Sequence, residues 1–346
     1  MRIYCHGSRF PEGHESGLSL VELMIALVLG LILSAGVITL FLESKRDYQV
    51  QEAISEVQES GRFAAEFIAN DARMAGFSGC SNDMATANTV DNAPSSVSNF
   101  ALGIEGHEGD AGTHPSKFPN ALDGSDAVVF HVTDMSSELV VKKHNASSAQ
   151  IDVVNDHAFK PGAIMMIVEA NCSNRGIFVM SGPTNNNENA DNVVHNTGKT
   201  FSYGATTGVG NCTKTLKGDF DCDGGTEVSR SYTEGSSVFS IVSVGYYLQD
   251  PSKNTALSSP TLYRINFSSE FTSGASDNLQ PLVEGVRDLD VLYGVRDGDD
   301  LRFKTADNVT TDEWSLVSVI RLEIEAESRT EVEGSSVSRS FVRTIK

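Results

Sequence analysis

The stretch Leu23–Leu42, LMIALVLGLILSAGVITLFL, decides the fold, because its 20 residues carry no charge. As an α-helix rising 1.5 Å per residue, it would cover roughly 30 Å, the thickness of the hydrocarbon core of a bilayer. It is apolar on all faces, unlike the surface helices of soluble proteins. It is longer than the core of an ordinary signal peptide, and no small-residue cleavage site follows it. We therefore predict an anchor that stays in the membrane.

One carboxylate, Glu22, stands at the start of this apolar stretch. Moving a carboxylate into hydrocarbon costs about 2.5–3.5 kcal/mol on insertion scales, and residues that do so are usually functional. The alternative is that Glu22 lies at the level of the lipid headgroups. Position alone does not separate these two interpretations.

The segment Gly17–Leu23, GLSLVEL, resembles the signal of type IV prepilins. In that signal a short polar leader ends in Gly, and a hydrophobic segment follows at once with Glu as its fifth residue. The resemblance implies cleavage by a prepilin peptidase between Gly17 and Leu18, followed by N-methylation of Leu18. It also implies that Glu22 pairs with the N-terminal amine of a neighbouring subunit. A buried carboxylate is tolerated when another charge neutralises it, and that need can set the register of subunits.

The helix is expected to continue beyond the membrane. No proline occurs between Pro11 and Pro94, so we predict one helix from Leu18 to Met74, roughly 85 Å long. Gly30, Gly36 and Gly61 are its candidate flexible points. Past Leu42 the apolar residues recur at three- and four-residue steps, which predicts an amphipathic helix, and these residues are Val50, Ala53, Ile54, Val57, Ala64, Phe67 and Ile68.

The stretch Glu59–Cys80, ESGRFAAEFIANDARMAGFSGC, is similar to the end of the stem in the PilW branch of minor pilins. Two downstream segments resemble the C-terminal region of that family, namely Pro281–Leu289 and Tyr293–Val295. So does a third set of positions, Trp314, Val317, Val319, Arg321 and Leu322. The middle of the chain, 81–280, carries no family motif.

The remaining chain predicts a β-rich head, since short runs of Val, Ile, Phe and Tyr alternate with polar clusters. We expect an α+β fold, with a leader at 1–17, a transmembrane and assembly helix at 18–42, an amphipathic stem helix at 43–76, and a mostly antiparallel globular head at 77–346. The intervals 81–124 and 183–235 read as irregular insertions, and 183–196 and 197–210 as loops. The strands are predicted at 127–133, 138–142, 151–154, 164–168, 177–180, 238–248, 262–265, 286–295, 316–324 and 337–345.

The chain has five cysteines and no CxxC pair, which argues against a zinc ribbon or thioredoxin chemistry. Cys5 stands apart near the N-terminus, and the other four would pair in an oxidising compartment. Four cysteines allow three connectivities. We favour Cys80–Cys172, which would tie the stem to the sheet, and Cys212–Cys222, which would close a short loop. The alternative is free, buried cysteines.

An acidic segment at 219–224, DFDCDG, matches the opening half of an EF-hand loop. The twelfth position, where the bidentate Glu belongs, is Arg230. The alternative interpretation is a solvated acidic turn. The candidate calcium ligands are Asp219, Asp221, Asp223 and Glu227.

The net charge of −20 disfavours nucleic acid as a partner. No GxxxxGK[ST] phosphate loop, HExxH or GxSxG motif occurs, and the eight histidines show no metal-ligand spacing. The sequence therefore predicts no catalytic residue and, apart from the calcium candidate, no cofactor.

The resemblance implies a minor pilin that helps initiate, prime or cap a type IV pilus, and not an enzyme. It implies a single-pass protein of the inner membrane with a periplasmic head, which later enters a surface pilus. The implied partners are other minor pilins, the major pilin and a tip adhesin. The alternatives are a minor pseudopilin of type II secretion, a tip adhesin that uses the loops at 183–235, and a membrane-anchored enzyme, which would need a pocket with convergent titratable groups.

Overall fold

The computed structural model of the chain describes residues 17, 19–77, 79–80, 84–93, 103–109, 114–115, 117–183, 190–203, 206–267, 278–298 and 300–346. The predicted leader residues 1–16 and Leu18 lie outside the described residues. The chain forms two compact units, 1–52 and 53–346. Helix α1 (Leu20–Met74) contributes residues to both.

In the first unit, α1 exposes a continuous apolar surface. Its large side chains from Leu20 to Leu42 are 54–75% exposed. The mean hydropathy of its most apolar window is 2.7, so α1 is long and apolar enough to cross a membrane. Gly30 and Gly36 have no other part of the chain within 4 Å of where a Cβ would lie.

In the second unit, α1 buries a narrow face of small residues, namely Ala53, Val57, Gly61, Ala64, Ala65, Ile68 and Ala69. Phe341 packs directly over Gly61, and a Cβ at Gly61 would lie 2.2 Å from the Phe341 ring. Gly61 is therefore a packing residue rather than the flexible point expected from the sequence. Ile54 and Phe67 were predicted on the buried face, but each is 41% exposed. They lie outside the narrow face that α1 buries against the head.

The main sheet of the head has 12 strands in the described part of the chain, in the order β12-β11-β1-β7-β6-β13-β4-β5-β8, with β14 between β13 and β15, and β3 beside β4. Most pairs are antiparallel, but β1 runs parallel to both β7 and β11. The strands are β1 (Ala85–Asn88), β3 (Ile104–His107), β4 (Ala127–Asn145), β5 (Gln150–His157), β6 (Ile164–Val168), β7 (Asn174–Val179), β8 (Ala190–Val194), β11 (Gly218–Asp221), β12 (Gly224–Glu227), β13 (Ser237–Gln249), β14 (Thr261–Asn266) and β15 (Leu279–Glu284).

Two smaller sheets complete the described head. The C-terminal sheet has the antiparallel order β17-β16-β18-β19, and a three-stranded sheet has the order β2-β10-β9. Their strands are β16 (Val286–Asp297), β17 (Asp300–Lys304), β18 (Val317–Glu327), β19 (Ser338–Ile345), β2 (Val90–Asp91), β9 (Thr200–Tyr203) and β10 (Thr206–Asn211). The 3₁₀ turns η3 (Ala306–Asn308) and η4 (Trp314–Leu316) lie between β17 and β18.

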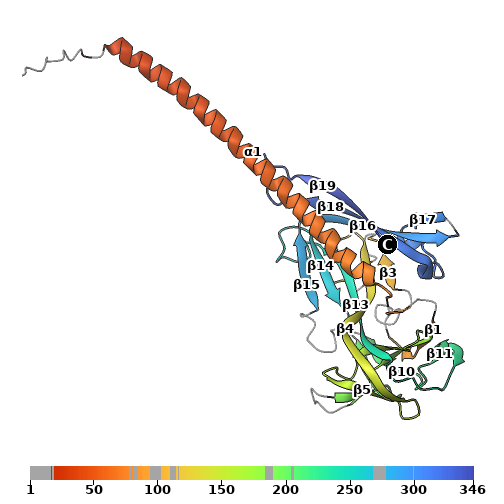
Figure 1. The fold of residues 1–346 in the computed structure, drawn as a ribbon. Helices are drawn as coiled ribbons and strands as arrows, with labels where there is room; N and C mark the ends of the chain where they lie inside the picture. The colour runs from red at the N-terminus through yellow and green to blue at the C-terminus, as the bar shows by residue number, and fades with distance from the viewer. Residues whose placement is uncertain are drawn as a thin grey trace, which may run out of the picture. The chain divides into compact units, whose positions relative to one another are not determined.

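The core joins the stem to both large sheets. Ala64, Ala65, Ile68 and Ala69 of α1 share one hydrophobic cluster with residues of β4, β13, β14 and β15 and with residues of β16, β18 and β19. Figure 1 shows the last turns of α1 running between the β14–β15 side of the main sheet and the β18–β19 side of the C-terminal sheet. One face of the end of the helix is thus part of the core of the head.

The long helix and the β-rich head confirm the predicted fold class. All ten predicted strand segments overlap strands, although 177–180, 316–324 and 337–345 each extend one residue beyond the observed strand. The segments 127–133 and 138–142 belong to one continuous strand, β4. The expectation of loops at 183–196 and 197–210 was wrong, since β8, β9 and β10 lie there. The intervals 81–124 and 183–235, expected to be irregular, also contain β1, β2, β3, β11 and β12. These strands are short and polar. β1, β2, β3 and β11 pair with strands that lie far away in the chain, whereas β12 pairs with β11 in a local hairpin.

Two disulfide bonds link the cysteines of the head in the pairing that the sequence favoured. Cys80–Cys172 connects the segment after α1 to the turn between β6 and β7. Cys212–Cys222 connects the end of β10 to the turn between β11 and β12. The partners are 92 and 10 residues apart in the sequence, respectively.

Replacing Gly61 by alanine should destabilise the head, although alanine favours helix by roughly 1 kcal/mol. The added methyl group would overlap the Phe341 ring, so we expect a net loss of about 1–2 kcal/mol in the free energy of unfolding. The measurement is urea unfolding of the detergent-solubilised chain, followed by the fluorescence of its one tryptophan, Trp314. Gly36→Ala is the matched control and should cause no loss. Equal stability of the Gly61→Ala variant and the control would contradict the packing role.

Loss of the two disulfides should have unequal effects, because a cross-link over a longer loop constrains the unfolded chain more. We expect the double variant Cys80→Ser/Cys172→Ser to lose about 4–5 kcal/mol and Cys212→Ser/Cys222→Ser about 3 kcal/mol. Urea unfolding of each double variant under the conditions used for Gly61→Ala measures both losses. A larger loss from the Cys212–Cys222 pair would contradict this ranking.

Candidate functional site

The predicted processing and assembly residues lie at the start of α1. Gly17 is exposed, and Leu18 lies outside the described residues. Ser19 caps the helix, since its Oγ accepts a hydrogen bond from the backbone N–H of Glu22 at 3.2 Å. Leu23 N–H donates to the Ser19 carbonyl at 3.1 Å. The pair Ser19 and Glu22 has the spacing of a capping box, a signal that the sequence analysis missed.

The carboxylate of Glu22 is exposed beside apolar neighbours. Val21 and Leu23 are 64% and 57% exposed, respectively. Within the described residues, Glu22 has no hydrogen-bond or ion-pair partner for its side chain. A negative charge in the first turn of a helix is favoured by the helix dipole, which offsets part of the cost of placing it next to an apolar surface.

The candidate calcium residues form a β-hairpin rather than an EF-hand loop. Asp221 pairs with Gly224 across a two-residue turn between β11 and β12. Its Oδ1 accepts hydrogen bonds from the backbone N–H groups of Asp223 at 3.0 Å and Gly224 at 3.1 Å. Glu227 Oε2 instead accepts a bond from the Thr213 hydroxyl at 3.3 Å. No group of three or more His, Cys, Asp or Glu side chains suited to a metal ion occurs among the described residues.

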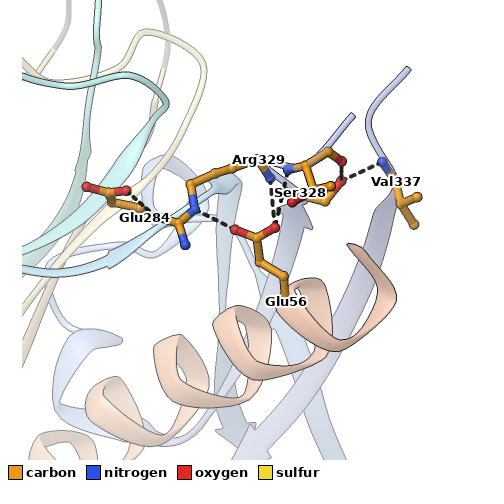
Figure 2. A network of polar contacts seen from close by, with 6 residues as sticks. Glu56, Glu284, Ser328, Arg329 and Val337 are labelled. Carbon is orange, nitrogen blue, oxygen red and sulfur yellow. Dashed lines mark hydrogen bonds and ion pairs between the residues drawn. The ribbon is translucent and has the colours of Figure 1, made fainter. Parts of the chain in front are cut away.

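A polar cluster at the flank of the stem, which we call the clasp, centres on Arg329 in the loop after β18. Figure 2 shows the Arg329 side chain between the carboxylates of Glu56 on α1 and Glu284 on β15. Its Nε donates to Glu56 Oε1 at 2.5 Å, and its Nη1 donates to Glu284 Oε2 at 2.9 Å. The backbone N–H groups of Arg329 and Thr330 donate to Glu56 Oε2 at 3.2 and 3.3 Å. One arginine thus joins the helix, the main sheet and the loop that follows β18.

The clasp keeps Glu56 ionised. Burial alone would raise the pKa of Glu56, but the hydrogen bonds from Arg329 and Thr330 and the charge of Arg329 outweigh burial and hold that pKa below its ordinary value. The hydrogen bond and charge of Glu56 in turn raise the pKa of Arg329. Ser328 fixes the loop from the other side, since its Oγ accepts a hydrogen bond from Val337 N–H at 2.9 Å, as Figure 2 shows.

Two further arginines of the head hold carboxylates of α1. Arg343 on β19 donates to Glu66 Oε2 at 2.5 Å. Arg264 on β14 donates to Asp71 Oδ2 at 3.0 Å, and the Tyr246 hydroxyl donates to the same oxygen at 2.6 Å. The helix therefore supplies the anions, and strands on both of its sides supply the cations.

None of these arginines could be recognised as a stem contact from the sequence. Their partners lie far away in the chain, with Arg329 separated from Glu56 by 273 residues. No local pattern reveals such a pair. A signal did exist for the helix face between them, since the small residues Ala53, Val57, Gly61, Ala65 and Ala69 recur every four positions.

Removing the Arg329 side chain should cost roughly 1 kcal/mol of unfolding free energy at pH 7, a modest value because the side chain is 56% exposed. The pKa of Glu56 is depressed in the folded state, so its contribution is complete above the ordinary value of 4.5 and is lost as pH falls through the folded pKa. The difference between wild type and Arg329→Ala should therefore shrink as pH falls below 4.5. Urea unfolding at pH 7 and pH 3 measures it.

The matched control is Arg302→Ala on β17, whose ion pair with Asp297 spans 3.8 Å between exposed side chains. This control should change stability by less than about 0.5 kcal/mol at either pH. A difference for Arg329→Ala that persists unchanged at pH 3 would contradict the ionic character of the clasp.

Comparison with protein families matches residues 245–342 to type IV pilus-assembly protein W and residues 13–38 to the prokaryotic N-terminal methylation motif. No curated protein and no solved structure matches the chain. The first match contains Arg264, Glu284 and Arg329 of the head, and the second contains Ser19 and Glu22. The methylation motif at the start of the apolar helix and the pilus-assembly segment beside the stem together support a PilW-like type IV pilin.

Proposed function

We propose that this chain is a minor pilin that helps to initiate, prime or cap type IV pilus assembly. The observation that carries the proposal is the single carboxylate, Glu22, at the start of an apolar helix that bears the methylation motif. The description of the matched segment at 245–342 names pilus assembly, which favours a pilus over a type II secretion system. Pilin-like families are structural rather than enzymatic, and the proposed role requires no chemistry from this chain.

The proposed mechanism begins with processing. A prepilin peptidase cleaves between Gly17 and Leu18 and leaves a new amine on Leu18, which is then methylated. Glu22 pairs with the corresponding amine of a neighbouring subunit as the apolar stems pack together. Since an unpaired charge in an apolar bundle is costly, this pairing fixes the axial register of the two stems.

The second half of the stem supports the same role. Residues 53–74 of α1 are part of the core of the head, and the clasp adds ionic contacts at the flank of the helix. A force applied to the stem helix can therefore be transmitted to the head, because Gly61 is packed against Phe341 and does not act as a flexible joint. The proposed partners are other minor pilins, the major pilin and a tip adhesin. The proposed location is the inner membrane, with the head in the periplasm, and then the surface pilus.

The experiment that tests the proposal is N-terminal peptide mass spectrometry of the chain in sheared surface fibres and in membranes. We expect a methylated Leu18 terminus in the fibre fraction. A chain that keeps Met1 and occurs only in membranes would overturn the proposal.

Substituting Glu22 should separate insertion from assembly. We expect Glu22→Ala and Glu22→Gln to insert into the membrane normally but to enter fibres at least roughly tenfold less, because the amine of the neighbouring stem loses its partner. Quantitative immunoblotting of fibre and membrane fractions measures the ratio. Glu43→Gln, which removes an exposed carboxylate just beyond the apolar run, is the control and should leave the ratio unchanged. Normal incorporation of both Glu22 variants would refute the assigned role.

A further inference from the structure

A groove of about 490 Å³ lies beside the stem in the second unit. One wall is a stripe of α1 that carries Glu56, Glu59, Ser60 and Phe63, which are neighbours on one face of a helix. The opposite wall is formed by four consecutive residues of β15, Pro281–Glu284. Consecutive strand residues alternate between the two faces of a sheet, so a surface lined by all four runs along the edge of the strand.

The groove carries more negative than positive charge. Three carboxylates line it, those of Glu56, Glu59 and Glu284, and one guanidinium, that of Arg329. Arg329 is shared between Glu56 and Glu284. Glu59 is exposed and makes no hydrogen bond or ion pair with another described residue. A second cation brought into the groove would therefore find an unpaired carboxylate.

The same wall of the groove presents an aromatic surface. Phe63, which lines the groove, is 40% exposed. Arg62 of the chain itself lies over the Phe63 ring at 5.4 Å from its centroid. A half-exposed aromatic ring beside a free carboxylate suits an arginine or lysine side chain, whose stem packs on the ring while its charge meets the carboxylate.

The strand that forms the other wall does not favour continuous backbone pairing. In the described residues β15 pairs only with β14, so its outer edge is open. Pro281 lacks an N–H donor, and the pairing with β14 shifts register between Val283 and Pro281, leaving Leu282 as an extra residue. Such an interrupted edge resists the addition of a regular strand. An occupant would therefore be held mainly by its side chains.

We propose that this groove docks a basic segment of a different pilin subunit, with an arginine or lysine side chain over Phe63 and in contact with Glu59. A second copy of this chain is a poor occupant, because 46 acidic against 26 basic residues give it a net charge of −20. The inference rests on the proposed function, since it assumes that the chain meets other pilins in the fibre. The inference adds which surface of this chain the other pilins contact, and that this surface favours a positively charged side chain.

The experiment replaces Phe63 or Pro281, one on each wall, by the photo-reactive residue benzoylphenylalanine in the full-length chain in piliated cells. After irradiation, the adducts in sheared fibres are identified by peptide mass spectrometry. We expect both positions to cross-link to the same segment of another pilin and that segment to contain an arginine or lysine. Adding Glu59→Lys should reduce the yield of the adduct by roughly tenfold or more, since like charges then face each other.

Glu234→Lys is the matched control, because Glu234 is an exposed carboxylate outside the groove, and it should leave the yield unchanged. An adduct with a second copy, with this chain itself or with lipid would overturn the inference, as would a yield that does not respond to Glu59→Lys. If the chain is present in fibres but gives no adduct, the docking proposal is overturned and the proposed function is not. Absence of the wild-type chain from fibres overturns the proposed function and the groove together.

Discussion

The close approach of α1 to two sheets at once is the constraint on which the rest of the head depends. The helix can enter the core because the face it buries is made of alanine, glycine and two larger aliphatic residues, Val57 and Ile68. At Gly61 the approach is closest, since the Phe341 ring occupies the space that a Cβ would need. A ridge of small residues every four positions is the geometry by which one helix face packs closely against another surface. The C-terminal strand β19 can pack its Phe341 ring against the helix because Gly61 has no side chain at that point.

Electrostatics adds specificity at the sides of this contact. In a chain with so large an excess of acid, Arg264, Arg329 and Arg343 all hold carboxylates of the stem. Exposed ion pairs contribute little free energy individually. Their value here is positional, because arginines on both sides of the helix limit its sliding and rotation between the sheets. Among the described residues, the same distribution leaves Glu59 without a cation, so the flank of α1 that faces β15 remains acidic.

The sequence predicted the parts of the fold that local pattern controls. The apolar run, the helical period and the long Val- and Ile-rich strands follow from residues within a few positions of one another, and α1, β6 and β13 lie close to where they were expected. The short strands β2, β11 and β12 contain mostly Gly and Asp, which are poor strand formers. β2 pairs with β10 and β11 pairs with β1 over long distances in the chain, whereas β11 and β12 form a local hairpin whose acidic residues were interpreted as a calcium loop. The buried face of the stem was misjudged because large apolar residues were counted as core. Phe67 is large and exposed, whereas Ala65 and Ala69 are small and buried.

The candidate sites divide in the same way. Gly17, Leu18 and Glu22 could be proposed from the sequence alone, because a processing signal is read by a peptidase as linear sequence and must be contiguous. The clasp is a property of the folded chain, and the segment similar to type IV pilus-assembly protein W supplies Arg264, Glu284 and Arg329, with Phe341 at its end. The part of the head that carries this resemblance therefore also forms ion pairs and packing contacts with the stem. A pilin needs both properties at once: a stem that packs with its neighbours, and a head that cannot slip along that stem. In the proposed function the first depends on apolar surface and on Glu22, and the second depends on small residues flanked by the ion pairs of Arg264, Arg329 and Arg343.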